Sequence, residues 1–244
     1  VSGAAAALNG IVSGAIAQSL IGPLAQPAAA PPFETVLHRA YNPEGRTSTN
    51  IVPGLLAIIL SMTMVMITAV AIVKERERGT MEMLISTPVR PLEVMAGKIL
   101  PYVFVGYVQT MVFLATGLTV FGVPFEGSWL AFFIGFNLYI VVNLALGFLI
   151  SAAARNQMQA MQLSIFTILP SVLLSGFLFP FAAMPGWAQV LGQVVPATHF
   201  LQVVRKVMLK GGAVDDVAPD FLALLVLLVV ISSLAMLRYR RTLD

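Results

Sequence analysis

Residues 51–73 read IVPGLLAIILSMTMVMITAVAIV, a run without a charged side chain, and residues 74–91 continue KERERGTMEMLISTPVRP. The first run is long enough for a helix across a bilayer, which needs about 20 apolar residues. A block of consecutive charged residues, Lys74 to Arg78, follows it directly. Either these charges only anchor the end of a membrane span, or they belong to a part of the protein that contacts another molecule outside the bilayer.

The composition places the whole chain in the membrane class. Of its 244 residues, 58% are hydrophobic and 10% are charged, and the mean hydropathy is +0.90. Soluble domains carry about 25% charged residues. The chain has no Cys, which excludes a disulfide framework and a thiolate metal site. We therefore expect an all-α polytopic membrane protein.

Five segments qualify as membrane-spanning helices by length and apolarity. They lie at about residues 51–73, 99–121, 129–154, 158–181 and 219–237, and the apolar core of the last begins at Phe221. Pro53 stands near the start of the first span, where a missing N–H costs little. Pro170 stands in the middle of the fourth span, where we expect a kink.

Residues 1–50 form a separate region. Residues 1–20 lack the basic start and the long apolar core of a signal peptide, and they predict an Ala-rich helix outside the hydrocarbon. Residues 22–50 are rich in Pro, Ala and polar side chains, which indicates a water-exposed loop. We expect residues 1–50 to be the C-terminal part of a periplasmic or extracellular loop domain, and residues 51–244 to be the transmembrane domain.

The basic residues predict the orientation, because cytoplasmic loops are enriched in Lys and Arg. If the spans alternate, one side of the membrane holds Lys74, Arg76, Arg78, Arg90, Lys98, Arg155, Arg238, Arg240 and Arg241. The other side holds Arg205, Lys206 and Lys210, which are followed closely by Asp residues. The N-terminal segment is therefore predicted outside and the C-terminus in the cytoplasm. An outside N-terminus without a signal implies an earlier span, so we expect a parent protein with six.

The sequence argues against several function classes. The apolar cores of the predicted spans contain no Asp, Glu, Lys, Arg or His, whereas ion-coupled carriers typically rely on such groups. The HExxH and GxSxG motifs are absent, and His38 and His199 are isolated, so no metal site is predicted. The sequence also has no GxxxxGK[ST] nucleotide-binding motif. A pump of this kind would take its energy from another polypeptide on the cytoplasmic side.

Residues 74–98 are more elaborate than an anchor requires. Met81, Leu84 and Ile85 recur at i, i+3 and i+4, which is the apolar stripe of a short helix. Pro88 ends this helix, and Pro91 begins a second helix that leads into the next span. The segment is also longer than a tight connection between helices needs. It is therefore predicted to contact a partner.

The same residues resemble a known family. Residues 75–84, ERERGTMEML, together with STPVRPLE at 86–93 and Gly97-Lys98, look like the cytoplasmic signature of ABC-2 type transporter permeases. These are transmembrane subunits of bacterial ABC exporters with the type V fold. YNPEGR at 41–46 and IVPGL at 51–55 resemble the multidrug-efflux branch of the family. The resemblance covers about residues 40–244, and residues 1–39 match loosely as the end of a large periplasmic loop.

The resemblance implies that residues 74–98 are a coupling segment, whose helix docks on a separate ATP-binding subunit. Glu75, Glu77 and Arg78 would make charged contacts, and Gly79 would permit close approach or a sharp exit from the first span. The apolar stripe would be the anchor. The full implied set is Glu75, Arg76, Glu77, Arg78, Gly79, Thr80, Met81, Glu82, Leu84, Ile85, Thr87, Pro88 and Arg90. For any one of them, a solvated charge or an ordinary packing residue is the alternative.

Residues 182–218 predict an outer hairpin of two short helices. The first has a continuous apolar face that contains Trp187, Val190, Leu191, Val194 and Val195. The second covers about residues 198–210 and is closed by a Gly pair. Neither can span the membrane, so both fit the outer interface.

Similar exporters have a re-entrant hairpin that lines the exit at this place. The resemblance therefore implies an exit role for Trp187, Leu191, Val194 and Phe200. A surface hairpin without a role in release is the alternative.

The family also implies a permease subunit that works as a homodimer or heterodimer with two ATPase subunits, whose closure switches the cavity from inward-open to outward-open. No cofactor is expected on this chain, and ATP and Mg would bind the partner subunit. Methionines adapt to varied apolar ligands, although they are also ordinary packing residues. The candidate cavity residues are Met62, Met64, Met66, Thr167 and Ser171.

We expect a multi-pass protein of the bacterial cytoplasmic (inner) membrane. It would move an apolar or amphipathic substrate, such as a drug-like molecule or a lipid, out of the cytoplasm or the inner leaflet. The expected partners are the ATPase subunit, a second permease copy and the lipid bilayer, with a periplasmic adaptor as a further candidate and no nucleic acid. The alternatives are a non-transporting scaffold or sensor subunit that binds an ATPase, and an ion-driven carrier.

Overall fold

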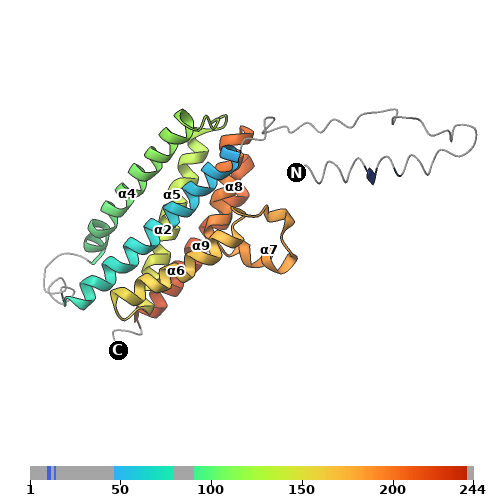
Figure 1. The fold of residues 1–244 in the computed structure, drawn as a ribbon. Coiled ribbons are helices and arrows are strands. Elements are labelled where there is room, and N and C mark those ends of the chain that lie inside the picture. The colour runs from blue at the N-terminus through green and yellow to red at the C-terminus, as the bar shows by residue number, and fades with distance from the viewer. Residues whose placement is uncertain (1–9, 12–13, 15–46, 80–90, 241–244) are drawn as a thin grey trace, which may run out of the picture. The chain divides into compact units, whose positions relative to one another are not determined.

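A computed structural model describes residues 10–11, 14, 47–79 and 91–240. The chain divides into two compact units, residues 1–45 and 46–244, and the long helices that the structure describes belong to the second unit. These helices and their connections form the bundle in Figure 1. They are α2 (Thr47–Glu77), α4 (Pro91–Thr119), α5 (Trp129–Ala153), α6 (Gln157–Leu174), the 3-10 turn η1 (Phe181–Ala183), α7 (Gly186–Gln193), α8 (Pro196–Lys210) and α9 (Val214–Arg240).

Five of the helices are long and apolar enough to cross a membrane. The candidate spans are Ile51–Glu77, Ile99–Thr119, Trp129–Ala153, Gln157–Leu174 and Val214–Arg238. Within the described part of the chain no strand occurs. The prediction of an all-α polytopic fold is confirmed.

Several helix ends differ from the predicted spans, and two of these differences have a clear local cause. The first span was predicted to end at Val73, but α2 continues to Glu77, because the charged residues after Val73 are themselves good helix formers. The fourth was predicted to reach Phe181, but α6 ends at Leu174. Gly176 follows with φ +87°, a left-handed conformation that ends the helix and that apolarity alone does not reveal.

The central helix α5 packs against α2, α8 and α9. Its contact with α2 is partly polar, because the Tyr139 hydroxyl donates to the Ala57 carbonyl at 2.8 Å and Ser61 Oγ donates to Asn143 Oδ1 at 2.6 Å. The two helices also approach closely at Gly147, where a Cβ atom would lie 2.8 Å from Val65 O. Small residues and interhelical hydrogen bonds replace hydrophobic burial as the basis of helix association in lipid.

Helix α8 is an internal element of the bundle. Phe200, Val203, Val204 and Val207 are fully buried, and the helix packs against α2, α5 and α9. The α4–α5 loop covers its C-terminal end, where the Glu126 N–H donates to the Met208 carbonyl at 3.2 Å. The apolar face of this helix therefore contacts neighbouring helices, and its predicted place in the outer interface stays a prediction.

Helix α4 is the least enclosed of the spanning helices. Leu100, Phe104 and Met111 are about 70% exposed, as expected for side chains that face lipid. Among the described residues, side-chain hydrogen bonds join α4 to both α2 and α5. Gln109 Nε2 donates to Thr63 Oγ1 of α2 at 3.3 Å, and the Tyr107 hydroxyl donates to Asn137 Oδ1 of α5 at 2.6 Å.

Candidate functional site

The charged residues after the first span lie on the last turn of α2. The helix ends where Gly79 takes a φ of +68°, and the Gly79 N–H donates to the Arg76 carbonyl at 3.2 Å. A left-handed glycine at this position satisfies the last carbonyls of a helix and lets the chain turn away. Residues 74–77, which carry these charges, are therefore part of the spanning helix.

The Arg76 side chain contacts the C-terminal end of α5. Its Nη2 atom donates to the Ser151 carbonyl at 3.1 Å and to the Ala154 carbonyl. The last carbonyls of a helix lack partners within the helix, and a cation is favourable at this negative end. The Ser151 carbonyl would ordinarily accept from residue 155, but the Arg155 N–H donates to Gln159 Oε1 instead, at 2.7 Å. Arg76 thus donates to a carbonyl at the end of α5 that lacks its usual backbone donor.

The Glu77 side chain contacts the N-terminal end of α6. Its Oε1 atom accepts from the Gln157 N–H at 2.9 Å, and its Oε2 atom accepts from Gln157 Nε2. Gln157 is the first residue of α6, whose N-cap Asn156 accepts from the Gln159 N–H at 2.8 Å. An anion is favourable at this positive end of a helix. Glu77 and Asn156 therefore satisfy different first-turn donors of α6.

Two consecutive side chains of α2 thus contact the two sides of the link between α5 and α6. We call Arg76, Glu77 and their partners Ser151, Ala154 and Gln157 the α2 clamp. A cation meets the negative end of one helix, and an anion meets the positive end of the next. The clamp was not predicted from the sequence, although the N-cap signal at Asn156 and Gln157 marks one half of it.

The family resemblance implied that Arg76 and Glu77 contact an ATPase, and this stays a prediction. Both side chains are exposed, and both make hydrogen bonds within this chain. Glu75 is half-buried, and Arg78 and Gly79 are exposed. The rest of the predicted coupling set lies outside the described residues: Thr80, Met81, Glu82, Leu84, Ile85, Thr87, Pro88 and Arg90.

The candidate cavity residues do not share one surface. Met62 is 44% exposed and Met66 is half-buried, whereas Met64 is fully buried in the core beside Gly106 of α4. Successive residues of a helix are about 100° apart, so the residue two positions from Met62 faces away from it. Ser171 of α6 is also buried, and its hydroxyl donates to the Thr167 carbonyl at 3.0 Å. Thr167 itself is half-buried.

An apolar cavity lies between α2 and α4 instead. Its volume is about 290 Å³, and none of the five candidate residues lines it. The lining consists of Ser48, Ile51, Val52, Leu55, Phe113, Thr116, Gly117 and Phe121.

The predicted exit residues also divide between two environments. Trp187, Leu191 and Val194 are at least half exposed, on or next to α7. Phe200 of α8 is fully buried, and its ring stacks on that of Tyr139 at a centroid distance of 4.2 Å. Only the α7 residues present a continuous exposed apolar face.

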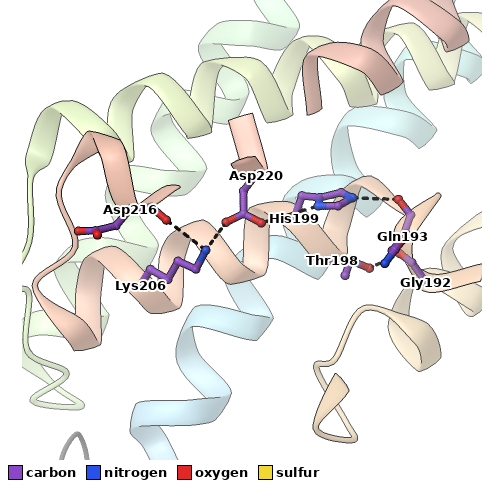
Figure 2. A network of polar contacts seen from close by, with 7 residues as sticks. All are labelled: Gly192, Gln193, Thr198, His199, Lys206, Asp216 and Asp220. Atoms are coloured by element: carbon purple, nitrogen blue, oxygen red, sulfur yellow. Dashed lines mark hydrogen bonds and ion pairs between the residues drawn. The ribbon is translucent and has the colours of Figure 1, made fainter. Parts of the chain in front are cut away.

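A polar network joins α7, α8 and α9 (Figure 2). Lys206 Nζ lies 2.7 Å from Asp220 Oδ2, and His199 Nδ1 lies 3.8 Å from Asp220 Oδ1. The other ring nitrogen, Nε2, lies 2.9 Å from the Gln193 carbonyl. The Asp220 carboxylate raises the pKa of His199, although burial opposes this shift. This partner of His199 was not predicted from the sequence, because Asp220 is distant along the chain.

The network fits a structural role better than a metal site. Among the described residues, no group of three or more His, Cys, Asp or Glu side chains could hold a metal ion. Lys206, which sequence analysis placed on the less basic side of the membrane, is neutralised by its pairing with Asp220.

Comparison with known proteins covers nearly the whole chain. Residues 2–237 match the family model described as ABC-2 family transporter protein. YbhS of Escherichia coli K12, a probable multidrug ABC transporter permease, is 32% identical over 205 residues, which are 84% of this chain and 54% of YbhS. The inner membrane transport permease YhhJ of the same organism is 34% identical over 194 residues, which are 78% of this chain and 51% of YhhJ.

A eukaryotic relative is similar over a shorter share of its own length. ABC transporter G family member 20 of Dictyostelium discoideum is 32% identical over 181 residues, which are 74% of this chain and 25% of that protein. This chain spans about half the length of the bacterial relatives that it matches. With five candidate spans and a family match over residues 2–237, the chain is a multi-pass membrane protein that belongs to the ABC-2 family of transporter proteins.

Proposed function

We propose that this chain is the transmembrane permease subunit of an ATP-binding cassette exporter, and that a separate subunit hydrolyses the ATP. The observation that carries the proposal is the charged last turn of α2, which begins the predicted coupling segment and is hydrogen-bonded to the α5–α6 link. Relatives named as ABC transporter permeases support it. ATP and Mg would bind the partner subunit.

The end of the bundle that carries the α2 clamp is proposed to face the cytoplasm. Lys74, Arg78 and Arg155 are exposed there, and short cytoplasmic loops are enriched in such residues. The last turn of α9, with Arg238, lies toward the same end in Figure 1. The N-terminal segment would then be outside, and the membrane would be the bacterial inner membrane.

The substrate is proposed to be apolar or amphipathic, such as a drug-like molecule or a lipid. Two permease copies would enclose its pathway, as a homodimer or a heterodimer. Met62 and Met66 remain candidates for the cavity, because they share one side of α2 and neither is fully buried. Trp187, Leu191 and Val194 remain candidates for the exit, and a periplasmic adaptor remains a candidate partner on that side.

The proposal is tested by reconstituting the native-length permease with its ATPase in liposomes and measuring release of a fluorescent amphipathic substrate. We expect transport that needs ATP hydrolysis and continues when a protonophore collapses the proton gradient. Transport that survives ATP depletion but stops with the protonophore would instead identify an ion-driven carrier. ATPase binding without transport across a panel of apolar and amphipathic substrates would identify a scaffold or sensor subunit.

A further inference from the structure

The α2 clamp joins the first residues of the predicted coupling segment to the α5–α6 link. Glu77 is two residues before the turn at Gly79, after which residues 80–90 begin. Any displacement of these residues therefore reaches Arg76 and Glu77 before it reaches the apolar part of α2. Among the described residues, these two side chains make the hydrogen bonds that join this helix end to α5 and α6.

The Glu77 carboxylate and the Nη2 group of Arg76 already have partners within the chain. Both carboxylate oxygens of Glu77 accept from Gln157, and one Arg76 nitrogen donates to two carbonyls. A contact with an ATPase through these atoms would have to compete with helix ends that need the same charges. Arg78 at the same helix end is also exposed, and its side chain makes no hydrogen bond to a described residue, so it is the better candidate for a partner contact.

The elements that the clamp joins are firmly packed. Helix α2 packs along both α5 and α6, and α5 packs along α8 and α9. The α5–α6 link is only residues 154–156, and the Ala154 N–H donates to the Ile150 carbonyl at 3.0 Å. A short link that is held on both sides transmits a displacement instead of absorbing it.

We propose that Arg76 and Glu77 are positioning residues, which make the end of α2 and the α5–α6 link move as one unit when an ATPase displaces the coupling segment. The inference deepens the proposed function and rests on it. It assigns these two residues to transmission of movement within the permease, and leaves partner binding to other residues of the coupling segment.

The first test measures substrate transported per ATP hydrolysed in the reconstituted complex. Arg76→Ala and Glu77→Ala should lower this ratio roughly 5-fold or more, the lower end of typical couplings between sites. Binding of the ATPase subunit and its basal ATP turnover should persist. Glu77→Gln should recover most of the ratio, since its amide oxygen can still accept from the Gln157 N–H. Lys74→Ala, which removes an exposed charge from the same turn, is the matched control and should keep the wild-type ratio.

The second test replaces half of the clamp with a covalent bond. Residues 1–244 contain no Cys, so Glu77→Cys with Gln157→Cys introduces the only thiols of this part of the permease. The unbridged double variant should be uncoupled, and bridging by a short bifunctional thiol reagent should restore transport per ATP. This rescue also shows that the double variant is folded.

Three results would overturn the inference. Bridging could stop transport while the ATPase stays bound, which would show that α2 and the link must move apart. Arg76→Ala and Glu77→Ala could keep the wild-type ratio, or they could release the ATPase subunit, which would make them partner contacts. A wild-type permease that binds no ATPase would refute the proposed function itself, and that failure is distinct from one confined to the variants.

Discussion

The ring of Tyr139 stacks on the ring of Phe200 at a centroid distance of 4.2 Å and an interplanar angle of 9°. The hydroxyl of the same tyrosine donates to the Ala57 carbonyl at 2.8 Å. A single side chain of α5 therefore contacts α8 through its face and α2 through its tip. Since both rings are fully buried, this contact ties the short helix α8 to the membrane-spanning bundle.

Phe200→Ala should destabilise the protein far more than Tyr139→Phe. Truncating a buried Phe to Ala costs about 3–5 kcal/mol, whereas an interhelical hydrogen bond in a membrane protein contributes about 0.6 kcal/mol on average. Thermal unfolding in detergent micelles would measure both. Phe104→Ala, at a site that is 69% exposed on α4, is the matched control and should change little. Equal losses for Phe200→Ala and Phe104→Ala would contradict the buried position of α8.

The methionines of α2 should separate into a stability residue and a transport residue. Met64→Ala should cost about 2–5 kcal/mol, because it leaves a cavity in a packed core. Met62→Ala, two residues away and 44% exposed, should change stability by less than about 0.5 kcal/mol. It should instead alter the substrate concentration that half-stimulates ATP turnover. A Met62→Ala variant with an unchanged response to every transported substrate would remove it from the cavity.

The stability contributed by His199 should depend on pH. Its pKa is raised in the folded protein, so its contribution is fully present below the ordinary His value of about 6.5 and is lost as the pH rises through the raised pKa. The groups that face it are Asp220 and the Gln193 carbonyl, and Lys206 lies on the other carboxylate oxygen of Asp220. The difference in unfolding midpoint between wild type and His199→Gln should therefore be largest near about pH 5 and shrink toward about pH 8. Parallel pH profiles for the two proteins would refute this.

The spans could be predicted from the sequence because their signal is local. The predicted third span, residues 129–154, agrees with α5 within one residue. Helix α8 shows the limit of such reasoning. Its apolar face was visible as a helical period, but the same period fits a face that meets lipid and a face that meets protein. Only the surrounding α2, α5 and α9 decide between them.

The candidate sites could be predicted only in part, for two physical reasons. Met62, Met64 and Met66 were grouped by residue type, although a spacing of two residues places Met64 on the opposite side of the helix. The partners of Arg76, Glu77 and His199 lie far along the chain, so their contacts depend on tertiary structure. A charge run in a sequence shows where charges are, but not which helix ends they meet.

In the proposed function, the coupling segment receives work from a separate ATPase. The most direct measurement is co-purification of the ATPase subunit with the native-length permease, followed by ATP turnover in lipid, for wild type and for Leu84→Asp with Ile85→Asp. The wild-type permease should retain the ATPase, and its substrate should stimulate ATP turnover. The double variant should lose the ATPase while its own thermal unfolding stays unchanged. If the double variant retained the ATPase and kept unchanged ATP turnover and transport, the coupling segment could not be the contact with the ATPase.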